Sequence, residues 1–233
     1  MRPFSIRKTL ILVSILAIPG FLFFYLLPRF AKNRYKSLPI FGQKVVAPTF
    51  HSVKGKKIPD TVYHIVPDFK LLNQESKEVN WKSLEGKIVV LNLFDYSEAA
   101  QKANQNMEIV KNNYPKNDLI RLVSISVDIE DQPKRLLDYA ASFKAKAGKW
   151  DFLSGDSSVV YPWIRDGLLL DVLMHRDAEG KAKYIYGHQF ILLDNARRIR
   201  GFYEAGNPEA MAKLDDEIKV LVAEDLRNLK DGR

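Results

Sequence analysis

The chain has 233 residues, of which 46% are hydrophobic and 27% are charged, and it contains no cysteine. This length suits one membrane anchor and one well-buried domain. The lack of cysteine excludes disulfide bonds, thiolate nucleophiles and zinc or iron–sulfur centres that are held by cysteine. For the same reason we expect no lipid attached through a cysteine.

The formal net charge of +8 is unevenly distributed along the chain. Residues 1–60 hold 11 of the 36 lysines and arginines and a single acid, Asp60. Residues 61–233 therefore hold 25 basic and 27 acidic side chains, a net charge of −2. Because a nucleic-acid-binding protein carries its positive charge on the folded part, we expect no nucleic-acid partner.

An uncharged apolar run covers residues 9–28, which is the length needed to cross the hydrocarbon core of a bilayer. It follows a basic N-terminus at 1–8 and runs directly into Arg29, without the small-residue site where a signal peptide is cleaved. We therefore predict an uncleaved, single-pass transmembrane anchor in contact with membrane lipid. Basic residues flank both ends, so the positive-inside rule barely distinguishes the two orientations. We expect the common one, with the large domain on the periplasmic side of the inner membrane.

Residues 29–60 are basic, contain proline and are weakly periodic, which predicts a tether. Its short basic run at 54–57 is either solvated or lies against anionic lipid headgroups.

Residues 61–233 alternate between strand and helix patterns. The domain is predicted to begin with a pair of strands that starts within 63–72 and has its turn at 73–76. Nearly continuous apolar runs at 88–94 and within 118–127 indicate buried strands. Helices are predicted at 97–113 and 132–143, and two strands at 184–194 and 198–203. A terminal amphipathic helix is predicted at 208–229, with Met211, Leu214, Ile218 and Val222 spaced for one buried face. Parallel-type strands with intervening helices predict an α/β domain with three layers.

Several stretches of this domain, in their order and spacing, resemble the Sco/SenC family of membrane-anchored copper chaperones with a thioredoxin-like fold. The resemblance covers about 63–203 and, more loosely, the anchor. It is carried by PDF at 67–69, GKIVV at 86–90, SISVD at 124–128, DQP at 131–133, WDFLSG at 150–155, FILLD at 190–194 and RIRGFY at 198–203. It implies a thioredoxin-like domain and a role near copper handling or cytochrome oxidase assembly.

The resemblance also implies where the family's chemistry would lie. The family has two cysteines separated by three residues and a histidine before the closing hairpin, ligands that suit copper and electron transfer. In this chain the cysteine positions fall on Tyr96 and Ala100, and the histidine position falls near Tyr186. His188 is two residues further on, which keeps the same face of a strand, so it is the remaining weak candidate for a metal ligand.

Other polar groups favour structural roles. No nucleophile elbow surrounds Ser97 in the stretch 95–98, so we interpret it as a helix cap rather than a hydrolase serine. Asp128, Glu130 and Asp131 lack the ligand pattern of a calcium loop and indicate a solvated turn. The pair at 174–175, together with Met107 and His188, has no metal-ligand spacing and is interpreted as ordinary core and surface residues.

These observations predict a membrane-anchored, catalytically inactive Sco-like protein with no cofactor. We expect it to bind a protein of the cell envelope, as an interaction or assembly factor for a respiratory oxidase or another complex. One alternative is a copper chaperone with a non-cysteine ligand set that includes His188. Another is a peroxidase-like thioredoxin-fold enzyme, against which the lack of cysteine argues.

Overall fold

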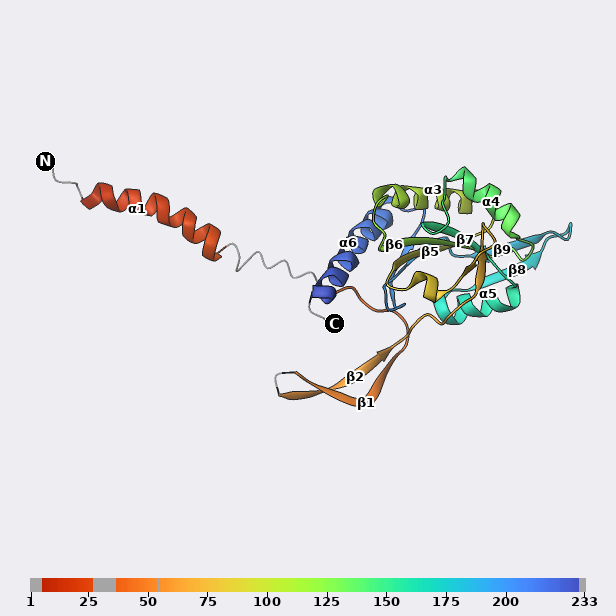
Figure 1. Ribbon diagram of the computed structural model, residues 1–233, viewed down its shortest axis with the longest axis horizontal. Helices are drawn as coiled ribbons and strands as arrows, with labels where there is room; N and C mark the ends of the chain where they lie inside the picture. Colours follow the sequence, from red (N-terminus) through yellow and green to blue (C-terminus); the bar gives the residue numbers. More distant parts are fainter. Residues whose placement is uncertain (1–5, 27–36, 54, 231–233) are drawn as a thin grey trace. The chain divides into compact units, whose positions relative to one another are not determined.

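The computed structural model describes residues 6–26, 37–53 and 55–230, which belong to two separate units, one within 1–36 and one from Ser37 onward. In the first unit, α1 (Ile6–Phe21) continues into the π-helical turn η1 (Leu22–Leu26) (Figure 1). Among the described residues, no helix combines the length and the apolar character that a membrane span requires. Residues 1–5 of the predicted N-terminus, 27–28 of the predicted anchor and 29–36 of the predicted tether lie outside the described residues.

The second unit is built around a seven-stranded sheet with the strand order β11-β10-β5-β6-β7-β3-β4 (Figure 1). These strands are β3 (Leu71–Asn73), β4 (Glu78–Val79), β5 (Ile88–Phe94), β6 (Ile120–Ser126), β7 (Trp150–Ser154), β10 (Gln189–Leu193) and β11 (Ile199–Glu204). Strands β5, β6 and β7 run parallel, and β10 and β3 flank them in the antiparallel direction. All seven residues of β5 are buried, as its apolar run predicted, because helices cover both faces of the sheet.

The helical elements of this unit are η2 (Trp81–Leu84), α3 (Glu98–Asn113), α4 (Pro133–Ser142), α5 (Ser157–Trp163), η3 (Ile164–Leu168) and α6 (Pro208–Lys230). Helices α3, α4 and α6 cover one face, in a core that contains Met107 and Leu136 (Figure 1). The other face is covered by α5, η2 and η3, in a second core that contains Trp163. Alternate residues of β5 enter the two cores. The predicted α/β domain with three layers is therefore confirmed.

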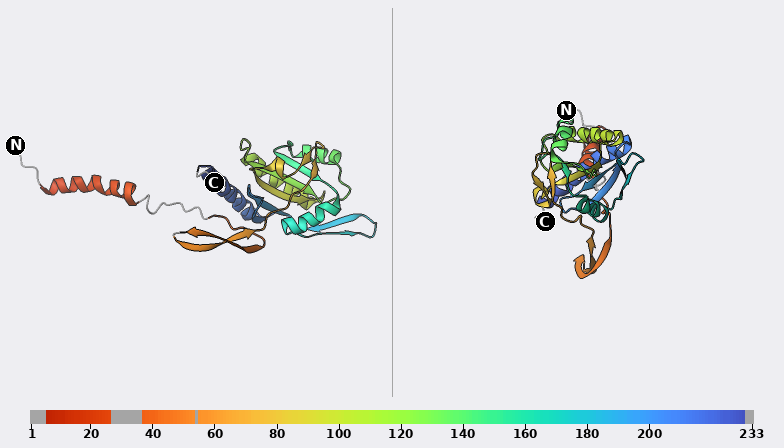
Figure 2. Two further views of the ribbon diagram at one scale, coloured as in Figure 1. Left: turned by 60° about the horizontal axis from the view of Figure 1, so that its bottom comes forward. Right: turned by 90° about the vertical axis from the view of Figure 1, so that its right-hand side faces the viewer.

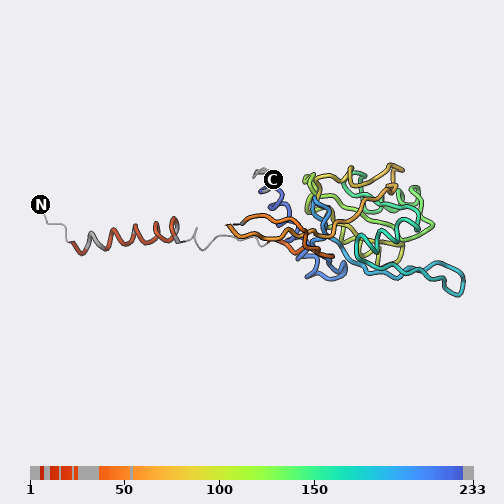
Figure 3. Tube along the Cα trace, turned by 90° about the horizontal axis from the view of Figure 1, so that it is seen from below, coloured from red at the N-terminus to blue at the C-terminus, as the bar shows by residue number. Residues whose placement is uncertain are grey.

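Two hairpins project from this unit, outside the main sheet (Figure 2, Figure 3). The first pairs β1 (Lys44–Val53) with β2 (Lys56–Tyr63), and the second pairs β8 (Val172–Arg176) with β9 (Ala182–Tyr186). The first hairpin lies largely in the stretch that we predicted as a tether, whose weak periodicity did not indicate strands.

The single strand predicted at 184–194 is wrong. Gly187 and His188 separate β9 from β10, because β9 pairs with β8 alone while β10 joins the main sheet.

The predicted helix starts agree with local chemistry. Ser97 caps α3, because its Oγ accepts a hydrogen bond from the Ala100 amide at 3.3 Å. Pro133 occupies the first turn of α4, where its missing N–H costs no helical hydrogen bond. In α6, Leu214 and Ile218 are fully buried, as their spacing predicted.

Candidate functional site

An open pocket of about 370 Å³ lies where β5 ends, α3 begins and the β8–β9 hairpin returns toward the sheet. Since β5 and β6 are parallel, their carboxyl ends bring the loops that follow them to the same edge of the sheet. The lining residues are Asp95, Tyr96, Ser97, Asp128, Arg135, Lys181, Ala182, Lys183 and Tyr184. The pocket therefore contains the first of the predicted cysteine positions, Tyr96.

Tyr96 is held on several sides. Its Oη donates a hydrogen bond to Oδ1 of Asp131 at 2.5 Å. The guanidinium of Arg135 lies over its ring, 3.6 Å from the ring centre, and the Tyr139 ring packs edge-on with centroids 4.9 Å apart. Burial, with help from the Asp131 carboxylate, raises the pKa of Tyr96. Tyr96 is therefore a neutral phenol fixed in one position.

Asp131 shows that the predicted solvated turn is wrong at this residue. Its side chain is fully enclosed and accepts hydrogen bonds from Ser126 Oγ and from Tyr96. Burial raises the pKa of Asp131, while these hydrogen bonds and Arg135 oppose the shift. The guanidinium of Arg135 lies 3.5 Å from Oδ1 of Asp131. It also donates a hydrogen bond to Oδ2 of Asp128 at 2.9 Å. The spacing of Asp131 and Arg135, four residues apart at the start of a helix, was the available sequence signal.

Two tyrosines of β9 fasten the β8–β9 hairpin over this edge of the sheet. The Oη of Tyr186 donates to Oδ1 of Asp95 at 2.9 Å and accepts from the Asp95 amide at 2.8 Å. The Oη of Tyr184 donates to Oδ1 of Asp128 at 3.1 Å and accepts from the Ile129 amide at 3.2 Å. Burial, followed by the charge of Asp95, raises the pKa of Tyr186. Each tyrosine therefore ties the hairpin to a different loop.

The remaining predicted positions lie differently. Ala100 is fully buried in the core beneath α3 and does not line the pocket. His188 lies between β9 and β10, where its ring packs against Tyr186 with centroids 4.7 Å apart. Its Nδ1 is buried and has no hydrogen-bond partner among the described residues. The fold thus brings Tyr96, Tyr186 and His188 to one end of the sheet, and it leaves Ala100 in the core.

These side chains do not fit the copper site that the resemblance implies. Tyr96 and Ala100, the positions that the resemblance implies for the two thiolates, cannot ligate copper through sulfur. Within the described part of the chain, no group of three or more His, Asp or Glu residues is arranged to hold a metal ion. Met107 is fully buried in the core, and Met174 lies on the projecting β8–β9 hairpin, 40% exposed. The set of Met107, Met174, His175 and His188 therefore does not form one site.

A buried polar network adjoins the pocket, and sequence reasoning missed it. Asn92 Nδ2 donates to Asn104 Oδ1 at 2.9 Å, and Ser124 Oγ donates to Asn92 Oδ1 at 2.6 Å. Trp150 Nε1 donates to Ser124 Oγ at 2.9 Å. Asn104 Nδ2 then donates to the Oη of Tyr139, which packs on Tyr96. Asn92, a polar residue inside an otherwise apolar strand, was the signal that pointed to this network.

Comparisons with known proteins agree with the stretches singled out in the sequence. The SCO1/SenC family model matches residues 59–221. The SCO1 protein homolog of Bacillus subtilis (strain 168) is 32% identical over 107 residues, which are 44% of this chain and 55% of that relative. The match thus spans about half the length of this relative.

Solved structures show the same fold. The structure of BsSco, a member of the Sco family of cytochrome c oxidase assembly proteins, matches with a TM-score of 0.57 and 22% identity, over 67% of this chain and 92% of that one. Bradyrhizobium japonicum ScoI with copper bound matches with a TM-score of 0.56 and 22% identity, over 65% and 98% of the two chains.

Proposed function

The chain belongs to the SCO1/SenC family, and we propose that it is a membrane-anchored, catalytically inactive member that acts as an interaction or assembly factor. Its partner would be a respiratory oxidase or another complex of the cell envelope. The observation that carries this proposal is the state of Tyr96. Where the resemblance implies a cysteine, the phenol of Tyr96 donates a hydrogen bond to Asp131, and the guanidinium of Arg135 lies over its ring. The pocket is kept as a shaped surface, but it has no thiol.

The proposed partner follows from the relatives, and the proposed inactivity follows from the composition. BsSco is described as belonging to a family of cytochrome c oxidase assembly proteins. Thiol–disulfide exchange requires an attacking thiolate, and this chain has no cysteine to supply one. We therefore propose that the chain supports assembly through binding and not through electron transfer.

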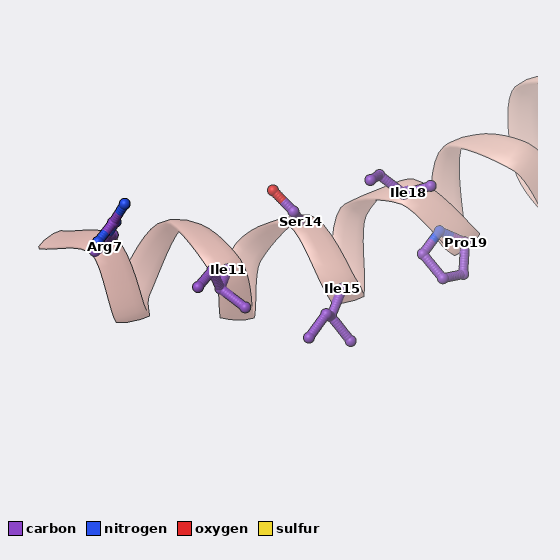
Figure 4. Close-up of a pocket in the computed structure, with 6 residues that line it drawn as sticks. All are labelled: Arg7, Ile11, Ser14, Ile15, Ile18 and Pro19. Atoms are coloured by element: carbon purple, nitrogen blue, oxygen red, sulfur yellow. The ribbon is translucent and has the colours of Figure 1, made fainter.

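The proposed anchor is the apolar run at 9–28, with residues 37–233 on the periplasmic side of the inner membrane. In α1, the side chains of Ile11, Leu12, Val13, Ile15 and Ile18 are between 56 and 69% exposed. Figure 4 shows Ile11, Ile15 and Ile18 along one shallow hollow lined by residues of α1 alone. By the 3.6-residue period of the helix, the exposed Leu12 and Val13 lie on its other sides. A helix that is apolar on all sides is suited to lipid.

The assembly role is tested in the organism that makes the protein. We expect that deleting the chain lowers terminal oxidase activity in isolated membranes and that the full chain restores it. Arg135→Glu reverses a charge in the pocket and should restore less activity than Lys82→Glu, which changes an exposed lysine of η2. Unchanged terminal oxidase activity in the membranes of the deletion strain would contradict this role.

One observation favours the alternative of a copper chaperone with a different ligand set. The buried Nδ1 of His188, beside Tyr186, has no hydrogen-bond partner among the residues that the structure describes, so it could serve as a metal ligand at this end of the sheet. Titration with Cu(I) and Cu(II) against a competing chelator tests it, with His188→Ala alongside. Binding that the variant loses would favour the chaperone. If the intact chain does not outcompete the chelator, this alternative fails.

A further inference from the structure

The β1–β2 hairpin carries apolar side chains that the rest of the described chain does not cover. Val45, Val46 and Val62 are between 56 and 67% exposed, Phe50 is 62% exposed and Ile58 is 41% exposed. In the described part of the chain the hairpin is a separate two-stranded sheet with no third strand. A two-stranded hairpin is only marginally stable in water by itself. An exposed apolar surface of this kind marks a binding site.

The base of this hairpin is fixed to the domain. The Phe41 amide donates to the Ile199 carbonyl at 2.9 Å, and the Phe41 ring packs edge-on against Phe202. His64 Nε2 lies 2.8 Å from the Gly167 carbonyl oxygen. The hairpin is therefore a defined arm that stands away from the main sheet, as Figure 2 and Figure 3 show.

The strand register places apolar groups on both faces of the arm. Val45 lies opposite Val62 on one face, while Phe50 lies opposite Pro59 on the other. A partner that covers one flat face would leave the second face in water. A bilayer interface can surround both faces of an inserted hairpin, since it is not a single rigid surface.

The charge of the arm is positive. Lys44, Lys56 and Lys57 are exposed, and the last two follow the turn at the tip. The single acid of the arm, Asp60, is engaged by His51 Nδ1 at 2.5 Å. The stretch that leads to this unit, 29–36, has four basic residues and no acid in its sequence. A second copy would present an arm of the same charge, which disfavours pairing between arms.

We propose that the β1–β2 hairpin binds the anionic surface of the bilayer, with Phe50 and Ile58 among the headgroups and Lys56 and Lys57 against lipid phosphates. This inference rests on the proposed membrane anchor. The connection to the proposed anchor would keep the arm within reach of the bilayer, because the ten residues between 26 and 37 span at most about 40 Å when fully extended. Amphipathic elements with apolar and cationic side chains bind such interfaces, and each basic residue strengthens attraction to anionic lipid.

The lack of cysteine permits a direct test on the full chain, since one introduced cysteine takes a spin label at one place. We would label Ser52→Cys on the arm and, as the matched control, Lys102→Cys on the exposed side of α3. The chain is reconstituted in nanodiscs of phosphatidylcholine alone or with phosphatidylglycerol. Collision of the label with oxygen and with a water-soluble nickel chelate then reports its depth.

We expect the Ser52 label to gain oxygen contact and lose nickel contact in the anionic discs, while the Lys102 label stays in water. In the background of Lys56→Glu with Lys57→Glu this difference should be lost. It should persist with Lys82→Glu and Lys116→Glu, two exposed lysines elsewhere that give the same change in net charge. Circular dichroism of each variant checks that the domain stays folded.

Two outcomes overturn the inference. The first is a Ser52 label that stays in water in both lipids. The second is protection from nickel that appears equally in detergent and is accompanied by spin–spin coupling between chains, which assigns the arm to a second copy. Failure of the anchor is separate, because the chain then does not enter the discs and is extracted from membranes by alkaline carbonate.

Discussion

Oη of Tyr96 lies 2.5 Å from Oδ1 of Asp131, and this hydrogen bond joins the loop after β5 to the loop before α4. The phenol thus connects the two loops at the edge of the sheet where the resemblance implies a thiol. Because Asp131 also accepts from Ser126 and lies beside Arg135, the pocket wall is a connected polar cluster. This cluster fixes the pocket wall through hydrogen bonds and an ion pair.

Replacing Asp131 by alanine should destabilise the domain. The change leaves the Tyr96 and Ser126 hydroxyls without their acceptor, and an unsatisfied buried polar group costs about 1–3 kcal/mol. Urea unfolding of the full chain in detergent measures the loss. Glu130→Ala, at the exposed neighbouring position, is the control and should change the free energy of unfolding little. Equal effects of the two changes would show that the Asp131 cluster contributes nothing specific.

The buried network behind the pocket should be equally sensitive. Asn104→Ala removes the oxygen that accepts from the Asn92 side chain, which is buried. It also removes the amide that donates to the half-buried Tyr139 hydroxyl. We expect a loss of about 2–4 kcal/mol from unpaired polar groups and the cavity. The exposed Gln101→Ala, on the same helix, is the matched control. Thermal unfolding that is unchanged in the Asn104 variant would contradict the network.

Asp225 should make stability depend on pH. Burial, with the nearby charges of Asp194 and Glu224, raises the pKa of Asp225 to about 6. An acid whose pKa is higher in the folded state stabilises the fold below its unfolded pKa, and this contribution is lost as pH rises through about 6. The contribution of Asp225 to the free energy of unfolding should therefore decline between about pH 4 and about pH 6. Asp225→Asn should flatten this slope, whereas the exposed Asp216→Asn should not.

Tyr186→Phe should loosen the β8–β9 hairpin while leaving the main sheet folded. The change removes both hydrogen bonds to Asp95, a loss of about 1–3 kcal/mol. Hydrogen exchange at the amides of β8 and β9 should become faster, and exchange in β5 should stay slow. Tyr63→Phe in β2 controls for loss of a phenol. Unaltered exchange in the hairpin would mean that Tyr186 does not hold it.

The sequence was most informative where one residue pattern determined one environment. The apolar run of β5 and the spacing of Leu214 and Ile218 predicted their burial, because a strand or helix between two layers has few alternatives. The resemblance implied one site at Tyr96, Ala100 and Tyr186. The structure brings Tyr96 and Tyr186 to the same end of the sheet and leaves Ala100 in the core. Whether they occupy the family's ligand positions stays a prediction.

What the sequence did not indicate depends on contacts between distant segments. The burial of Asp131 needs Ser126 and Tyr96 around it, so its acidic neighbours misleadingly suggested a solvated turn. The β1–β2 hairpin has mixed side chains on both faces, which removes the alternation that normally signals a strand. Gly187 separates two strands that read as one apolar-rich stretch.

We propose that the pocket beside Tyr96 contacts a protein partner and performs no chemistry. A photo-crosslinking amino acid at Lys183, which lines the pocket, tests this in intact cells, with the same group at Lys82 as the control. We expect the group at position 183 to form a discrete adduct with an oxidase subunit or another envelope protein. The group at position 82 should form no adduct with that protein. No adduct from position 183, together with tight copper binding that His188→Ala abolishes, would contradict the proposal.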